Sequence, residues 1–115
     1  MSFRSRKNSI GYAISGLRWL FLGEPNTRLH AAASILAVAL GVVRHIGQMQ
    51  WAALVFAIGL VWITEAINTC IEKLCDFSCD NRIHPAIKVI KDVSAGAVLM
   101  AAIVSIAIGV IIFIF

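Results

Sequence analysis

The feature that most constrains the fold is the stretch 95–115, which carries no charged side chain over its full length. As an α-helix this stretch is about 30 Å long, which matches the thickness of the hydrocarbon layer of a bilayer. Two further apolar stretches, 29–47 and 51–71, are candidates for the same role; Trp51 is an aromatic residue suited to the membrane interface. We therefore predict three transmembrane spans.

The composition agrees with a membrane protein. The chain has 115 residues, of which 60% are hydrophobic and only 14% are charged, far from the average of soluble domains. This length corresponds to one domain, so we predict that residues 1–115 form a single all-α integral membrane domain. The net charge of +4 does not call for a nucleic-acid partner, because attraction to anionic lipid headgroups explains it.

Residues 1–22 have the pattern of an amphipathic helix rather than of a span. The apolar residues that share one stripe of this helix are Phe3, Ile10, Ile14, Leu17 and Phe21. Such a helix lies in the plane of the membrane surface with its apolar face buried. Gly23 and Pro25 are expected to end it and to turn the chain into the first span.

Lysine and arginine residues are distributed unevenly. They precede the first span and lie between the second and third, whereas only Arg44 lies between the first two and none follows the third. Because basic residues concentrate on the cytoplasmic side, we expect a multi-pass protein of the cell membrane with its amino terminus and the loop 72–94 in the cytoplasm. The acidic residues all fall on that half: Glu24, Glu65, Glu72, Asp76, Asp80 and Asp92.

A polar face begins inside the second apolar stretch. At about 100° per residue, its members point in similar directions along a helix. They are Glu65, Asn68, Thr69, Glu72 and Asp76. Acidic side chains within a membrane span are costly, so they indicate a functional site. The alternative, a solvated helix end, remains open for Asp76 but does not explain Glu65, Asn68 and Glu72 together.

These residue types suit phosphoryl transfer. Carboxylates hold Mg²⁺, which prefers oxygen ligands and shares them with substrate phosphates. Lys88 and Lys91, on a helix expected to start at Pro85, can neutralise phosphate charge, although a basic face near anionic headgroups also explains them. Glu65 lies about 21 Å along the helix from Trp51, at the depth of a lipid hydroxyl. It is therefore the natural base.

The sequence blocks around these residues resemble the small prokaryotic diacylglycerol kinases, a family that includes the undecaprenol kinases. The blocks are Glu24-x-Asn26-x-Arg28-x-His30, Glu65-x-x-Asn68-Thr69-x-x-Glu72-x-x-x-Asp76 and His84-Pro85-x-x-Lys88-x-x-Lys91-Asp92-x-x-Ala95-Gly96-Ala97-Val98. The resemblance implies three-span chains with an amino-terminal surface helix, assembled as a homotrimer with active sites between subunits. It implies an ATP-dependent kinase of a lipid alcohol.

The resemblance also implies roles for individual residues. Glu65 is expected to be the catalytic base, and Glu24 and Glu72 are expected to be ligands of Mg²⁺. The residues implied for the nucleotide and phosphate site are Asn68, Lys91 and Asp92. For the histidines we expect capping, interface or packing roles; they are His30, His45 and His84.

The acceptor and the activity have alternatives. Diacylglycerol, which would yield phosphatidic acid for phospholipid biosynthesis, is the first candidate because it is the more general assignment in the family. Undecaprenol also presents a primary hydroxyl at the interface, and no residue here distinguishes the two tails. A small multidrug or ion transporter needs a carboxylate near mid-membrane, but the first and third spans contain none. A structural or hole-forming protein leaves the acidic face and Lys91-Asp92 unexplained.

Overall fold

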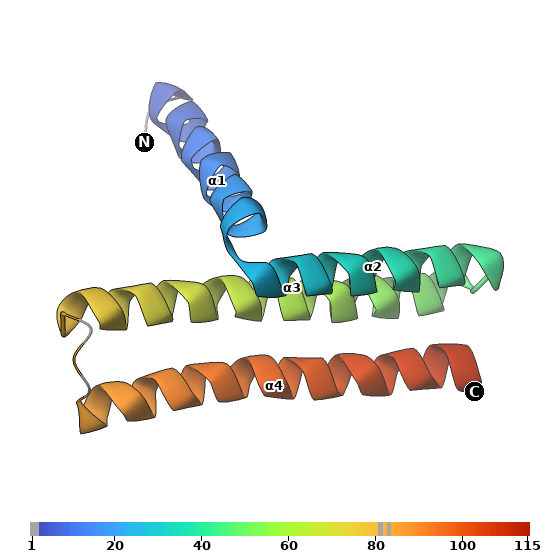
Figure 1. Ribbon diagram of the computed structural model, residues 1–115. Helices are drawn as coiled ribbons and strands as arrows, with labels where there is room; N and C mark the ends of the chain where they lie inside the picture. Colours follow the sequence, from blue (N-terminus) through green and yellow to red (C-terminus); the bar gives the residue numbers. More distant parts are fainter. Residues whose placement is uncertain (1–2, 81, 83) are drawn as a thin grey trace.

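The computed structural model describes residues 3–80, 82 and 84–115, with side chains from residue 8 onward. This part of the chain forms four α-helices (Figure 1). They are α1 (Phe3–Gly23), α2 (Pro25–Val43), α3 (Gln48–Ser78) and α4 (Pro85–Ile114). Three of them, α2, α3 and α4, are long and apolar enough to cross a membrane, which confirms the prediction of an all-α chain with three such helices.

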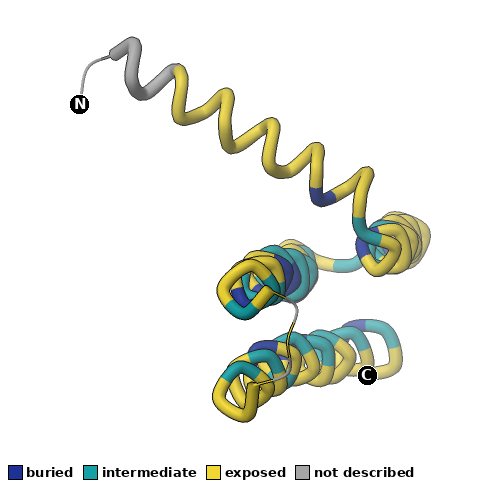
Figure 2. The backbone as a smooth tube through the Cα atoms, turned by 60° about the vertical axis from the view of Figure 1, so that its left-hand side comes forward, coloured by how far each residue is buried: buried dark blue, intermediate teal, exposed yellow. Residues whose placement is uncertain are grey.

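The three long helices lie side by side, whereas α1 projects from the amino-terminal end of α2 (Figure 1). The antiparallel hairpin of α3 and α4 has the most extensive interface, and α1 makes few contacts with the rest. Most buried residues lie on the long helices, and most of α1 is exposed apart from Leu20 (Figure 2). The buried hydrophobic residues are correspondingly few: Leu20, Leu54, Ala57, Cys75, Ala101 and Ile112.

The break between α1 and α2 falls where the sequence predicts it. Helix α1 ends at Gly23, and Pro25 starts α2, since proline is tolerated in a first turn where no backbone N–H is required. The hydroxyl of Thr27, which is completely buried, lies 2.5 Å from the carbonyl oxygen of Glu24 and 3.1 Å from that of Leu20, so it connects the start of α2 with the end of α1. Most of the predicted surface helix 1–22 coincides with α1; residues 1–2 and the side chain of Phe3 lie outside the described residues.

A tight turn joins α2 to α3. The predicted span 29–47 begins inside α2 and extends into this turn, where His45 has a φ of 52°. The helices approach closely here: a Cβ added to Gly41 would lie 2.8 Å from the ring of Trp51. Arg44 donates to the carbonyl oxygen of Phe113 at 3.2 Å, which connects the turn with the end of α4.

Helix α4 runs without interruption from Pro85, as the sequence predicts, and its first turn is capped by His84. Nδ1 of His84 accepts a hydrogen bond from the backbone N–H of Ala86 at 3.2 Å. This bond satisfies one of the amide groups that have no partner inside a helix. A capping role was among those expected for the histidines, and His84 has it.

Candidate active site

The polar face of α3 is buried where α3 faces α2 and α4. Glu65, Asn68 and Thr69 are only 5%, 8% and 4% exposed, and Ser94 of α4 is 8% exposed. We call these four residues the buried polar layer. The helical period brings the first three to one side of α3, as predicted, and α4 supplies the fourth. Polar groups are costly to bury without partners, so the contacts of this layer define what it can do.

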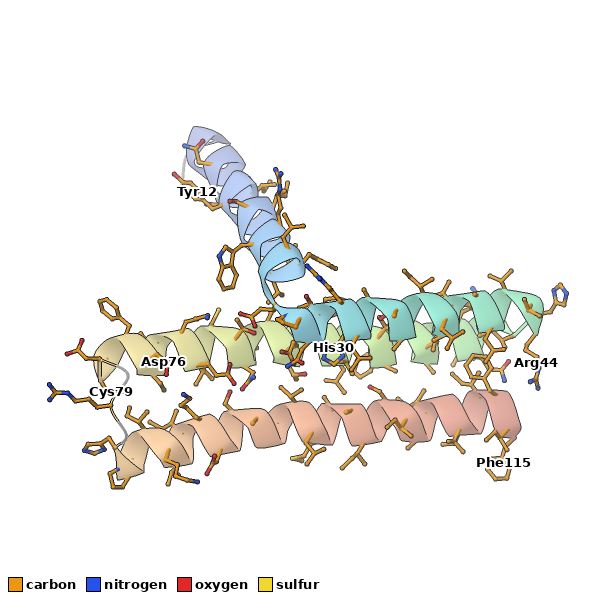
Figure 3. All side chains as sticks on the ribbon, viewed as in Figure 1. Tyr12, His30, Arg44, Asp76, Cys79 and Phe115 are labelled. Atoms are coloured by element: carbon orange, nitrogen blue, oxygen red, sulfur yellow. The ribbon has the colours of Figure 1, made fainter. Side chains whose placement is uncertain are left out.

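Glu65 contacts a histidine of α2. Oε2 of Glu65 lies 3.4 Å from Nε2 of His30, and the two side chains are 7% and 22% exposed. Figure 3 shows His30 at the contact between α2 and α3. This pair was not predicted from the sequence, because it depends on how two helices are rotated against each other.

Asn68 connects α3 to α4 and to Glu72. Its Oδ1 accepts a hydrogen bond from the hydroxyl of Ser94 at 2.7 Å. Its Nδ2 donates to Oε1 of Glu72 at 3.3 Å. Since the amide oxygen is taken by a donor, the amide nitrogen must point towards the carboxylate. Asn68 thereby orients Glu72, which is half-buried at the edge of the layer.

Glu24 lies in the break between α1 and α2 and is brought to α3 by a lysine. Nζ of Lys73 is 3.8 Å from Oε1 of Glu24, and it also lies 5.8 Å from the centre of the Trp19 ring. Lys73 directly follows Glu72 in α3. The two predicted metal ligands thus lie on neighbouring elements, Glu24 before α2 and Glu72 in α3.

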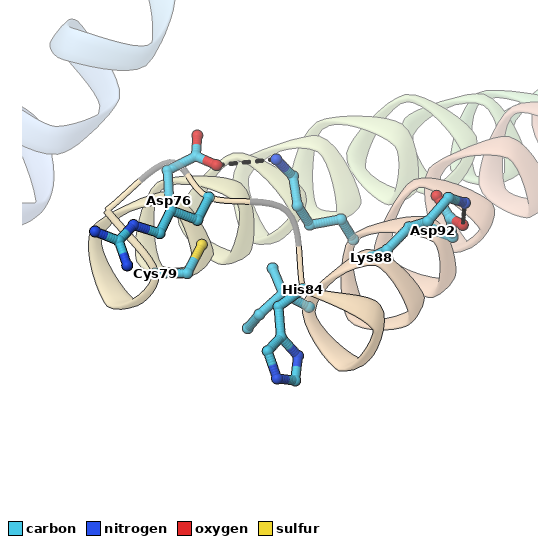
Figure 4. Close-up of a pocket in the computed structure, with 8 residues that line it drawn as sticks. Asp76, Cys79, His84, Lys88 and Asp92 are labelled. Atoms are coloured by element: carbon cyan, nitrogen blue, oxygen red, sulfur yellow. Dashed lines mark hydrogen bonds and ion pairs between the residues drawn. The ribbon is translucent and has the colours of Figure 1, made fainter.

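A pocket of about 290 Å³ lies at the turn between α3 and α4 (Figure 4). We call it the turn pocket; its lining residues are Asp76, Cys79, Arg82, His84, Ile87, Lys88, Lys91 and Asp92. Two ion pairs lie in its lining. Nζ of Lys91 in α4 is 2.9 Å from Oδ1 of Asp76 in α3, and Nζ of Lys88 is 2.6 Å from Oδ2 of Asp92 on the same helix. The hydrogen bond and the charge of Asp76 raise the pKa of Lys91 above its usual value, so this lysine is fully charged near neutral pH.

An apolar groove of about 390 Å³ runs along the long helices, and His30 is one of its lining residues. Helices α2, α3 and α4 all line it, and its residues are Leu29, His30, Ala33, Ser34, Ala37, Leu54, Ala57, Ile58, Val61, Ala102, Ser105, Ile106, Gly109 and Phe113. No residue of the groove is acidic, lysine or arginine. It is therefore suited to a hydrocarbon chain, and His30 connects it to Glu65.

The donor set fits Mg²⁺ only in combination with phosphate. In the part of the chain that the structure describes, no cluster of three or more His, Cys, Asp or Glu side chains is close enough to hold a metal ion. Mg²⁺, however, is commonly bound through one or two carboxylates together with the phosphates of a nucleotide, rather than by a cage of protein ligands. Glu24 and Glu72 are carboxylates of this kind, and both are partly accessible.

The predicted site residues therefore form separate groups along one side of the molecule. Asn68 and Glu72 are hydrogen-bonded to each other, and Glu65 lies one helical turn before Asn68. Lys91 and Asp92 line the turn pocket. Glu24 contacts Lys73. Sequence reasoning missed the partners His30, Ser94 and Lys73, and it left the roles of Asp76 and Lys88 open between the site and an ordinary solvated face. The spacing of Ser94 from Lys91 puts both on one side of α4, and this is the signal that could have pointed to Ser94.

Comparison with known proteins gives a consistent result. The profile of the family described as prokaryotic diacylglycerol kinase matches residues 11–113. The chain is 32% identical over 101 residues to a diacylglycerol kinase of Synechocystis sp., an alignment that covers 88% of this chain and 58% of that protein. It is 36% identical over 90 residues to an undecaprenol kinase of Bacillus subtilis, covering 78% of this chain and 72% of that one. This chain thus spans somewhat more than half the length of the Synechocystis relative, and it belongs to the prokaryotic diacylglycerol kinase family.

Proposed function

We propose that this protein is an ATP-dependent kinase that transfers the γ-phosphoryl group to the primary hydroxyl of a membrane lipid alcohol. The observation that carries the proposal is the buried carboxylate of Glu65, which is next to His30 at one end of an apolar groove and one helical turn from the Asn68–Glu72 pair. This arrangement suits the transfer of a phosphoryl group to the hydroxyl of a lipid. Two similar proteins are named as kinases of lipid alcohols.

Glu65 is the proposed general base. As the acceptor hydroxyl attacks the γ-phosphorus, its proton passes to a carboxylate oxygen of Glu65. The bond from the γ-phosphorus to the bridging oxygen breaks, and ADP leaves with the electrons of that bond. A base for this step must reach the hydroxyl of a lipid. This requirement supports a carboxylate in the membrane-spanning part of α3 over one near the turn between α3 and α4.

The nucleotide phosphates are proposed to lie between Asn68 and the turn pocket. Lys91 and Asp92 line this pocket, and Arg82 and Lys88 add positive charge to it. The ion pairs of Lys91 and Lys88 are exposed enough for either lysine to exchange its carboxylate partner for a phosphate. Positive charge matters here because phosphoryl transfer is catalysed mainly by positioning and by electrostatic stabilisation.

Glu24 and Glu72 are the proposed ligands of Mg²⁺. Bound between these carboxylates and the nucleotide, the ion would neutralise charge on the phosphates. Lys73 now contacts Glu24, and Asn68 donates to Glu72, so both carboxylates are already held near α3. What the protein contributes is the orientation of these two oxygen ligands.

The acceptor is proposed to be diacylglycerol, with undecaprenol as the alternative. The groove beside His30 has room for part of a hydrocarbon chain and no charged group that would select one tail over another. Its lining by α2, α3 and α4 supports a chain lying parallel to the helices, with the hydroxyl near Glu65. The similarity to a diacylglycerol kinase and to an undecaprenol kinase is of comparable strength.

The proposed setting is the cell membrane, with α1 on its cytoplasmic surface and the turn pocket in the cytoplasm. The exposed apolar side chains of α1, among them Ile10, Ile14 and Leu17, support contact with lipid. A homotrimer with sites between subunits is also proposed, because the described residues of one chain hold no cluster of three or more metal-binding side chains. In such a trimer, mixing the two impaired variants, Glu65→Gln and Glu24→Gln, should restore part of the activity.

The test of the kinase is phosphate transfer by purified protein in lipid vesicles without any ion gradient. ATP labelled at the γ-phosphate is supplied with diacylglycerol or with undecaprenol, in the presence of Mg²⁺ or of a chelator. We expect Mg²⁺-dependent label in extractable lipid, with one acceptor preferred. A transporter would need a gradient and would leave the label in ATP. No labelled lipid from either acceptor, in a folded sample, contradicts the proposal.

A further inference from the structure

His30 lies where it can control the proposed base. Its Nε2 is 3.4 Å from Oε2 of Glu65, longer than a typical N–H···O hydrogen bond but within the range that tightens when a substrate binds. The Glu65 side chain is 7% exposed, so solvent cannot orient its carboxylate. A carboxylate in such a place needs a donor to define which of its oxygens faces the substrate.

The position of His30 is itself fixed from α3. The hydroxyl of Ser34 donates to the carbonyl oxygen of His30 at 2.7 Å, and Nε1 of Trp62 donates to that hydroxyl at 3.0 Å. The rings of His30 and Trp62 meet edge to face with centroids 6.1 Å apart, and Phe21 of α1 packs on Trp62 at 4.7 Å. Trp62 precedes Glu65 by one helical turn, so the imidazole and the carboxylate are held by the same part of α3.

We propose that His30 is a positioning residue for the catalytic base, an inference that rests on the proposed role of Glu65. An N–H at Nε2, present in one neutral tautomer and in the imidazolium, binds Oε2 of Glu65 and leaves Oε1 to take the proton of the acceptor hydroxyl. His30 also lines the apolar groove, so it lies between the lipid chain and the base. It does not accept or donate a proton in the reaction.

Two substitutions separate this role from simple packing. His30→Leu introduces an apolar side chain of similar size and removes the donor, whereas His30→Gln places an N–H near the position of Nε2. Because a misplacement of about 1 Å at a reacting group can cost about 10²-fold in rate, we expect His30→Leu to lower kcat by up to about 10²-fold. The KM for ATP should stay unchanged, since His30 does not line the turn pocket. The KM for the lipid should change less than kcat, since the other lining residues of the groove are kept. His30→Gln should recover most of the lost kcat.

The matched control is His45→Asn, at the opposite end of α2. His45 has a positive φ, which asparagine tolerates, and it is exposed in the turn before α3. We expect this variant to keep the kcat of the unmodified protein. Trp62→Phe is a milder test: it retains the ring but removes the N–H that holds Ser34, so kcat should fall less than in His30→Leu.

All variants are purified in the same lipid, their melting temperatures are compared, and kcat and both KM values are measured. In the Glu65→Gln background, His30→Leu should cause no further loss, because the two residues act as a unit. Unchanged kcat in His30→Leu overturns the inference, as does a loss that His30→Gln shares in full. If Glu65→Gln itself retains kcat, the base assignment fails instead, which is a different result. Should His30→Leu not fold, the kcat of His30→Gln and Trp62→Phe decides in the same way.

Discussion

The two ends of the polar face of α3 hold their charged side chains in different ways. At Glu65 and Asn68 the side chains are buried and have partners on α2 and α4, at 3.4 Å and 2.7 Å. Two turns further on, Asp76 reaches Lys91 across a pocket, and both side chains are about two-fifths exposed, at 41% and 38%. The first arrangement fixes geometry at the cost of desolvation, and the second leaves charges free to change partners.

This difference matches what each end is proposed to bind. Proton transfer from a lipid hydroxyl depends on a base held within a fraction of an ångström, which a packed, hydrogen-bonded layer provides. Binding and release of a nucleotide depend on charges that can be exposed and covered again. We therefore expect substitutions in the buried polar layer to have large effects, and those in the turn pocket to have small effects on the fold.

The largest effect is expected from Glu65→Gln. Glutamine keeps the shape and can still accept from His30, but it cannot take a proton, so kcat should fall by about 10²-fold or more. The control is Thr64→Val, because the hydroxyl of Thr64 donates only within its own helix, to Leu60 at 2.8 Å and to Val61 at 3.0 Å. Phosphate transfer to lipid is the measurement. Near-normal kcat in Glu65→Gln would show that the buried end is structural and would break the comparison.

Ser94→Ala tests whether the buried layer is held by its hydrogen bonds. Without this hydroxyl, Oδ1 of Asn68 loses its donor in a buried place, which should cost about 1–3 kcal/mol in the free energy of unfolding. Ser105→Ala is the control in the same helix, since its hydroxyl donates to a backbone carbonyl of Ala57 and its loss should cost about 1 kcal/mol or less. Denaturant titration in mixed micelles measures both. Equal losses in the free energy of unfolding for the two variants would mean that the hydrogen bond to Asn68 stabilises the protein no more than the bond of Ser105 to the backbone.

Of the proposed metal ligands, Glu72 lies between the two ends and Glu24 lies before α2, and the effect of changing either should be intermediate. Removing even an outer partner of a bound metal typically costs about tenfold in affinity, so Glu72→Gln and Glu24→Gln should each weaken the apparent affinity for Mg²⁺ by at least about tenfold. The melting temperature should change little for Glu24, which is partly exposed. A magnesium titration of the kinase rate checks this. An unchanged midpoint would assign these carboxylates to structure instead.

The parts of the fold and of the candidate site that could be predicted from the sequence are those that depend on local interactions along the chain. The three long apolar helices, the break at Pro25 and the continuous helix from Pro85 follow from composition and from backbone chemistry within a few residues. The common face of Glu65, Asn68 and Thr69 follows from the helical period alone. The pairs that give these residues their geometry, with His30 and with Ser94, were not predicted. They depend on the rotation and relative height of separate helices, which no pattern within one helix specifies.

The Lys91–Asp76 pair leads to a prediction about pH. Asp76 raises the pKa of Lys91 above its usual value of 10.5, so the charged lysine is favoured in the folded protein. A raised pKa contributes stability that is fully present below the unfolded value and is lost only as the pH rises through the folded one. The change in melting temperature caused by Lys91→Met should therefore be the same at neutral pH and at mildly alkaline pH. If the effect of Lys91→Met on the melting temperature disappeared at mildly alkaline pH, the ion pair between Lys91 and Asp76 would not be its cause.

The smallest effect is expected from Lys88→Met. Lys88 and Asp92 are one helical turn apart on α4, and their side chains are 69% and 64% exposed, so water competes with the pair at 2.6 Å. Pairs of this kind on a helix surface are worth about 0.3–0.5 kcal/mol, so the free energy of unfolding should change by no more than that. The measurement is a double-mutant cycle with Asp92→Asn by denaturant titration, repeated at high salt, which should remove the coupling. A coupling as large as the loss expected for Ser94→Ala would show that the turn pocket is as rigid as the buried polar layer. Nucleotide binding there would then require a preformed site rather than an exchange of partners.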